Sequence, residues 1–146
     1  MNAADEYYLR FPSVLKKAIK DYGIDFPKET QWEYSPQTAF RGFTREDGEN
    51  TELRDEDFLS YAELGKKARG QKHSERDIEW YSCSCYARKA QLEVNLKLPR
   101  SKWRISRGII RNNKGCICIN KSTGHIHWWI YENANPSEDF EVINDE

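Results

Sequence analysis

Side chains that ligate metals stand in pairs at alternate positions of this sequence. The pairs are Cys83 and Cys85, Cys116 and Cys118, and His125 and His127. Residues two apart in an extended strand project to the same face. If the two cysteine pairs lay on neighbouring strands, the four thiolates Cys83, Cys85, Cys116 and Cys118 would therefore offer a tetrahedral site for zinc.

The spacing of these cysteines favours a simpler interpretation. Same-face positions of one strand lie about 6 to 7 Å apart, which is wide for two ligands of one ion, and structural zinc sites use Cys-x2-Cys turns. Free cysteine is also among the most frequently buried residue types. The sequence therefore favours four reduced, buried thiols, with zinc as the alternative.

The segment 81–94, YSCSCYARKAQLEV, alternates serine with cysteine before a second alternating run. If residues 78–86 form a strand, Cys83 and Cys85 face the core, while Ser82 and Ser84 face the wetter side. The two hydroxyl groups would then be available for function.

Three short motifs resemble those of the ADP-ribosyltransferase fold. They are AFRGF at 39–43, YSCSCYARKA at 81–90, and QLEV at 91–94 with LPRSKWRI behind it. The first is similar to the aromatic-Arg-Gly strand that opens the fold, the second to its Ser-x-Ser strand and following helix, and the third to its Gln-x-Glu signature.

This resemblance implies a site that binds NAD. Arg41 would grip the cofactor phosphates, Ser82 or Ser84 would order the site, and Glu93 would hold the nicotinamide ribose. A guanidinium suits a diphosphate, and a carboxylate stabilises charge that develops on a ribose. If HIHWW instead takes the place of the glutamate strand, His127 stands at the glutamate position. The alternative is a strand arginine in an ordinary ion pair and serines bonded to nearby backbone.

The two neighbouring histidines admit two interpretations. His125 and His127 share a strand face with Trp129 and Tyr131, which could form the rim of a ligand pocket. Hydrogen-bonded structural histidines are the more frequent case, and the sequence favours them.

Charge is distributed unevenly along the chain, although the net charge is −1. Residues 94–131 contain no acidic residue and eight basic ones, whereas residues 132–146 contain six acidic residues and no Lys or Arg. Basic residues interspersed with tryptophan could contact nucleic acid, but a solvated sheet face or pairing with the acidic segment accounts for them equally well. Nucleic acid is therefore the less favoured partner.

Hydrophobic periodicity predicts helices before a sheet. Helices are expected at 11–23 and 54–70, an exposed loop at 71–77, and turns at 111–115 and 120–124. The expected strands are 38–44, 78–86, 91–98, 102–110, 115–119 and 125–131. Helices followed by a mostly antiparallel sheet define an α+β class, in a single domain of residues 1–146 with an acidic C-terminal tail at 132–146.

The function that the sequence favours is binding. We expect a cytosolic chain without a membrane span, because no secretory leader or long apolar run is evident. Its many Trp and Tyr residues suit an interface with a protein partner, of the inhibitor, immunity or mobile-element accessory type. A transferase-like protein that binds NAD, active or degenerate, is the alternative. Apart from that resemblance, no cofactor is indicated.

Overall fold

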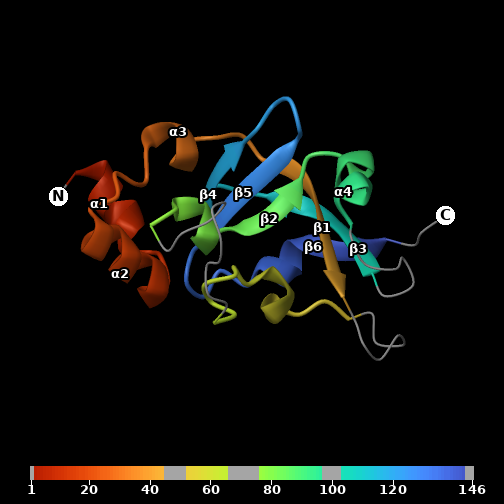
Figure 1. The fold of residues 1–146 in the computed structure, drawn as a ribbon. Coiled ribbons are helices and arrows are strands. Elements are labelled where there is room, and N and C mark those ends of the chain that lie inside the picture. Colours follow the sequence, from red (N-terminus) through yellow and green to blue (C-terminus); the bar gives the residue numbers. More distant parts are fainter. Residues whose placement is uncertain (1, 45–51, 66–75, 97–102, 144–146) are drawn as a thin grey trace.

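The computed structural model describes residues 2–44, 52–65, 76–96 and 103–143, built around a six-stranded antiparallel sheet (Figure 1). Three helices precede the first strand. The strands are β1 (Gln37–Thr44), β2 (Cys83–Tyr86), β3 (Trp103–Ile110), β4 (Gly115–Ile119), β5 (His125–Ile130) and β6 (Phe140–Ile143). Their order across the sheet is β4-β5-β2-β1-β3-β6. The predicted α+β class, with helices first and an antiparallel sheet after them, is confirmed.

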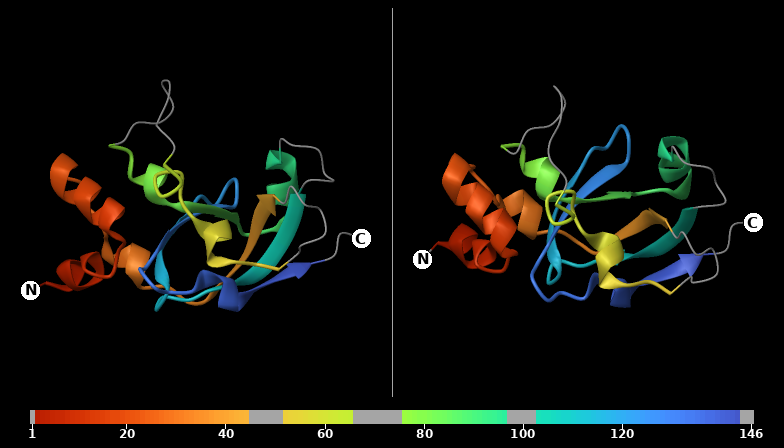
Figure 2. Two further views of the ribbon diagram at one scale, coloured as in Figure 1. Left: turned by 90° about the horizontal axis from the view of Figure 1, so that it is seen from below. Right: turned by 60° about the horizontal axis from the view of Figure 1, so that its bottom comes forward.

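Four α-helices accompany the sheet. They are α1 (Ala3–Tyr8), α2 (Ser13–Tyr22), α3 (Glu29–Trp32) and α4 (Lys89–Asn95). The helix predicted at 11–23 is α2, which buries Leu15, Ala18 and Ile19 and ends at Gly23 in the left-handed conformation. The first two helices pack at one end of the sheet, and α4 lies at the other (Figure 2). No helix in the described part of the chain is long and apolar enough to cross a membrane.

The sheet consists of two halves that are joined loosely. Strands β1 and β3 pair along their whole length, from Gln37 opposite Ile110 to Thr44 opposite Trp103. Strands β1 and β2 share only the pair Phe40 and Tyr86. The half β4-β5-β2 is therefore joined to the half β1-β3-β6 through a single strand-paired position, and the strands curve around the core (Figure 2).

Two aromatic clusters fill the interior. The larger lies on one face of the sheet, where Phe58, Trp128 and Phe140 meet, with ring centroids 5.0 to 6.1 Å apart. The second joins the N-terminal helices to β4 and β5 through Phe11, Phe26, Trp129 and Tyr131. Their large rings supply the apolar area that a highly charged chain needs to fold.

The helix predicted at 54–70 is wrong over its described part. Only the 3₁₀ helix η1 (Asp55–Phe58) forms, followed by turns up to Gly65, which has a φ of 73°. The Asp57 carboxylate caps the backbone N–H of Arg54, and the buried Phe58 needs only one turn to reach the core. Residues 66–70 lie outside the described residues, as does most of the predicted loop at 71–77.

The strand predicted at 91–98 is also wrong, because residues 89–95 form α4. Leu92 and Leu96 are four residues apart, so the same sequence also fits a helix that faces the sheet. Leu92 is buried, whereas Val94 is 84% exposed, which an alternating strand does not allow. Residues 97 and 98 lie outside the described part.

The remaining predicted strands form. One of them is shorter than predicted, and one predicted hairpin is not found. In the segment 78–86, the 3₁₀ helix η2 (Ile78–Tyr81) replaces the first half, and only β2 is extended. The turn at 120–124 joins β4 and β5 as a hairpin. The turn at 111–115 does not make a hairpin, because β3 and β4 are not neighbours in the sheet.

The acidic segment at 132–146 folds back onto the sheet where it is described. Its residues form the 3₁₀ helix η4 (Pro136–Asp139) and the strand β6. Lys114 lies 3.4 Å from Glu138 and 3.1 Å from Asp139, and Arg107 lies 3.2 Å from Glu141. Pairing of the basic and acidic segments within the chain, one of the alternatives for this charge pattern, is thus confirmed.

Candidate ligand-binding face

The strand register divides the residues of interest between two faces of the sheet. Ser84 pairs with His127, and His127 pairs with Cys118, so these residues share one face. We call it the serine–histidine face; it comprises Ser82, Ser84, Tyr86, Cys118, His125 and His127. The opposite face, which we call the thiol face, comprises Arg41, Cys83, Cys85 and Trp128.

Ser82 and His127 form the first polar pair of the serine–histidine face. The Oγ of Ser82 lies 2.9 Å from Nδ1 of His127 and 2.8 Å from the main-chain oxygen of Glu79, to which the hydroxyl donates. One assignment of the protons satisfies both contacts, with the Nδ1–H of His127 donating to Oγ of Ser82. Ser82 lies on the side opposite to the thiols, as predicted, but it is only 6% exposed, so the predicted exposure of its hydroxyl is wrong.

Ser84 and His125 form the second pair, with 2.5 Å between Oγ and Nε2. Both side chains are partly buried. Burial lowers the pKa of His125, because an imidazolium loses hydration there. The favoured interpretation of the two histidines as hydrogen-bonded residues agrees with both pairs.

Four rings form a row across this face. Successive centroids are 5.0 Å apart for Tyr86 and His125, 4.3 Å for His125 and His127, and 5.9 Å for His127 and Trp129. Trp129 is buried, whereas the other three rings are partly exposed. Sequence reasoning missed Tyr86, although its spacing of two and four residues from the serines places it on their face.

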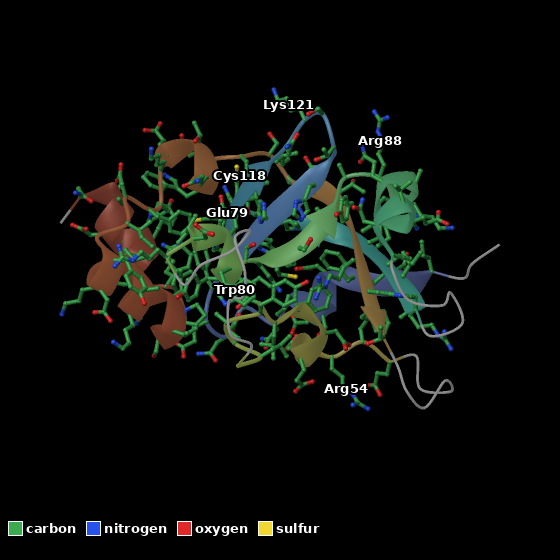
Figure 3. The ribbon with its side chains drawn as sticks, viewed as in Figure 1. Arg54, Glu79, Trp80, Arg88, Cys118 and Lys121 are labelled. Atoms are coloured by element: carbon green, nitrogen blue, oxygen red, sulfur yellow. The ribbon has the colours of Figure 1, made fainter. Side chains whose placement is uncertain are left out.

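Charged residues border the row. Figure 3 shows Arg88 and Lys121 at the top of the view, with Cys118 and Glu79 below them. This arrangement follows from the strands, since Arg88 comes two residues after Tyr86 and Lys121 lies in the hairpin before His125. The face is therefore a polar and aromatic surface with a basic end.

Arg41 does not join the serine hydroxyls. Phe40 pairs with Tyr86 in an antiparallel register, so Arg41 lies opposite Cys85 on the thiol face. Its Nε donates to the main-chain oxygen of Asp57 over 3.1 Å, and its Nη1 to that of Ser84 over 2.7 Å. The guanidinium thus ties β1 to β2 and to η1. Of the residues implied by the resemblance, Ser82, Ser84 and His127 come together, and Arg41 stands apart from them.

Glu93 lies on α4 rather than on a strand, because the QLEV segment is helical. It is partly buried and lies two residues before Asn95, the exposed last residue of that helix. A helix that packs on β1 and β2 places its carboxylate on a different element from the serines. The Gln-x-Glu strand that the resemblance implies is therefore absent from residues 89–95.

The four cysteines do not form a zinc site. Cys83 and Cys85 lie on the thiol face, Cys116 and Cys118 lie on the opposite face, and β5 separates their strands. Among the described residues, no three His, Cys, Asp or Glu side chains are grouped to hold a metal ion. The expectation of buried thiols holds for three of the four, and Cys118 is exposed.

The environments of the buried thiols differ. Burial raises the pKa of Cys116 to about 11, although Tyr131 lies 3.5 Å from its sulfur. For Cys83, burial is opposed by the hydrogen bond of Cys85 and by the Arg41 guanidinium, and its pKa is lowered. The pKa of its partner Cys85 is raised, because this thiol is hydrogen-bonded to Cys83 and is buried.

No protein-family model, curated protein or solved structure matches this chain.

Proposed function

We propose that this chain is a small, cytosolic, non-catalytic module that binds a protein partner through the serine–histidine face. The row of the partly exposed rings of Tyr86, His125 and His127 is the observation that supports the proposal most. Partly exposed aromatic side chains anchored by neighbours are the residues that contribute most to protein interfaces. The hydrogen bonds of His125 and His127 to the two serines hold their rings in place before a partner arrives.

The same contacts favour recognition over catalysis. A serine nucleophile needs an accessible hydroxyl whose proton a base can take. The Ser82 hydroxyl is buried and donates to a backbone carbonyl oxygen. The Arg41 side chain lies on the thiol face, and two of its N–H groups donate to main-chain oxygens. These groups thus stabilise the sheet on which the face is built.

Photo-crosslinking from Cys118 tests the proposal, because this exposed thiol lies beside His127. The protein is labelled with a benzophenone maleimide and irradiated in lysate of the cells that produce it. Cys118→Ser combined with Lys20→Cys moves the label to an exposed position on α2 and serves as control. We expect a discrete protein adduct from Cys118 that Tyr86→Ala diminishes. Equal adducts from both positions, or none from Cys118, would count against the proposal.

A second candidate is a degenerate ADP-ribosyltransferase-like protein that binds NAD. It is favoured by the neighbouring order β5-β2-β1, which sets the arginine strand beside the serine strand, and by α4, which contains Ala90 and follows β2 directly. His127 then stands opposite Ser84, where the family would place a carboxylate strand. Titration calorimetry with millimolar NAD separates the candidates, since heat of binding supports this one and its absence removes it.

A further inference from the structure

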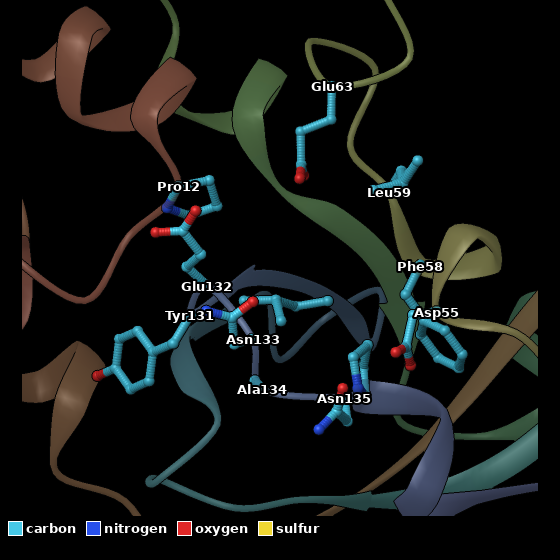
Figure 4. A pocket seen from close by; sticks show the side chains of 12 residues that line it. Pro12, Asp55, Phe58, Leu59, Glu63, Tyr131, Glu132, Asn133, Ala134 and Asn135 are labelled. Carbon is cyan, nitrogen blue, oxygen red and sulfur yellow. The ribbon is translucent and has the colours of Figure 1, made fainter.

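A cavity of about 300 Å³ lies beside the loop that follows β5 (Figure 4). Three parts of the chain line it: the start of α2, the segment from η1 to Glu63, and residues 130–136. Two residues of its floor, Asn133 and Asn135, have positive φ values of 62° and 53°. None of its lining residues belongs to the serine–histidine face, so this cavity is a separate candidate site.

The lining combines apolar walls with carboxylates. Pro12, Phe58, Leu59 and Ile130 supply apolar surface, and Asp55, Glu63 and Glu132 supply acidic groups. In Figure 4, Glu63 reaches down toward the middle of the cavity, while Glu132 and Asp55 lie on opposite sides of it. An occupant must therefore present an apolar length together with positive charge.

Two of the carboxylates are held in place on one oxygen only. Oε1 of Glu63 accepts from the backbone N–H and the hydroxyl of Ser60, at 3.2 and 3.0 Å. Oδ1 of Asp55 accepts in the same way from Ser137, at 3.1 and 2.7 Å. The second oxygen of each is not used by these contacts. Fixed carboxylates with one oxygen directed elsewhere are preorganised to accept hydrogen bonds from a ligand.

Within the described residues, the acidic side chains that line this cavity have no basic partner, whereas the acidic side chains next to the cavity are paired. Within the described residues, Asp55, Glu63 and Glu132 form no ion pair with Lys or Arg. The adjacent acidic groups Glu138 and Asp139 are both paired with Lys114. In the described part of the chain, the carboxylates next to the cavity are therefore neutralised, whereas those that line it are available to attract a cation.

We propose that the cavity receives an arginine side chain presented by a protein partner. Its methylene groups would pack on Pro12, Phe58 and Leu59, and its guanidinium would donate to Glu63 and Asp55. A metal ion fits less well, because no three acidic groups among the described residues are close enough to share one ion. The planar fork of arginine can reach carboxylates on separate walls, which a compact ammonium group cannot.

Binding of N-acetyl-arginine methylamide to the whole chain tests this assignment without a known partner. Amide signals of Ser60, Asn133, Asn135 and Ser137 are followed in nitrogen-15 spectra during the titration. The matched probe is the citrulline analogue, which has the same shape and no charge. We expect these amides to shift with the arginine probe at millimolar concentrations and to stay in place with the citrulline probe.

Two variants locate the charge that binds. Asp55→Asn combined with Glu63→Gln should weaken the arginine probe about fivefold or more, as expected for the loss of two exposed charge contacts. Glu56→Gln, an exposed carboxylate of η1 outside the cavity, should leave the affinity unchanged. A urea melt of the double variant checks that it is folded, and the comparison of the two probes on the unaltered chain does not depend on it.

Three results would overturn the assignment: no amide shifts with the arginine probe, equal shifts with both probes, or displacement of the arginine probe by equimolar calcium. Absence of shifts would mean that the cavity binds no arginine, equal shifts would mean that binding is apolar, and displacement by calcium would mean that the cavity is a metal site. A lysine analogue that binds more tightly than the arginine probe would also contradict it. Because no residue of this cavity is used in the crosslinking test from Cys118, either proposal can fail alone.

Discussion

Nη1 of Arg41 donates to the main-chain oxygen of Ser84 over 2.7 Å, while the hydroxyl of the same serine is hydrogen-bonded to His125 on the other side of the sheet. The arginine and the serine hydroxyl are therefore separated by the strand itself. This relationship distinguishes a structural arginine from one that grips a ligand together with the serines, and it separates the two candidate functions.

Replacement of Arg41 should destabilise the fold. Arg41→Met leaves the carbonyl oxygens of Asp57 and Ser84 without their charged donor, and each such hydrogen bond contributes about 1.5 to 3 kcal/mol. We expect a loss of about 3 kcal/mol in the free energy of unfolding, measured by urea denaturation. Arg107→Met removes an exposed pair with Glu141 and should cost less than about 1 kcal/mol. Equal losses in the two variants would contradict a structural role for Arg41.

Only one of the four cysteines should react in the folded protein. Cys118 is exposed, whereas Cys83, Cys85 and Cys116 are buried, and the pKa of Cys116 is raised to about 11. Because the thiolate is the reactive form, iodoacetamide at pH 8 should add one label to the native chain and four in denaturant. Mass spectrometry counts the labels, and Cys118→Ser should take up none when native. Rapid labelling of Cys83 would show that the thiol face is open.

Stability should fall as the solution becomes mildly acidic, in part because of His125. Its pKa is lower in the folded than in the unfolded state, where it is about 6.5. Below that value the unfolded chain takes up a proton before the folded one does, so the free energy of unfolding decreases as pH falls, by at most about 1.4 kcal/mol per pH unit for this group. Urea melts between pH 7 and pH 5 should show a shallower dependence in His125→Gln. An unchanged slope would mean that another group is responsible.

Position 108 should accept only glycine, because β3 and β6 approach each other closely there. A Cβ there would overlap the carbonyl oxygen of Asp139 and the ring of Phe140. Gly108→Ala should therefore cost about 2 kcal/mol, within the range of overpacked cores. Gly42→Ala is the matched control, because the atom nearest to a Cβ there belongs to the Trp103 ring and lies 3.0 Å away, a milder contact than the overlaps at position 108. A larger loss at position 42 would argue against the β3–β6 pairing.

Much of the fold could be predicted from hydrophobic period and turn residues. The period of α2 is unambiguous, and β3, β4 and β5 are bounded by turn residues that leave few alternatives. The segment 91–98 was different, because its leucines fit both a period of two and a spacing of four. A short helix forms there with Leu92 buried and Leu96 just past its last residue, and no local signal distinguishes that outcome.

The candidate site was predictable in its residue types but not in its pairing. Alternation alone places Ser82 and Ser84 on one side of the segment that contains β2, and His125 and His127 on one face of β5. That β2 and β5 are neighbours follows from the sheet order, which depends on contacts far apart in sequence. The cavity beside Glu63 draws its residues from three segments, so no single stretch of sequence indicates it.

The central claim is that Arg41 has a structural role inside the protein, whereas the serine–histidine face binds a partner. The Nε–H signal of Arg41 in nitrogen-15 spectra provides the most direct test of this claim. We predict that this proton exchanges slowly with solvent, because it is hydrogen-bonded to the main-chain oxygen of Asp57. We also predict that its signal keeps its position when millimolar NAD is added. Rapid exchange, or a shift of this signal on addition of NAD, would contradict the account.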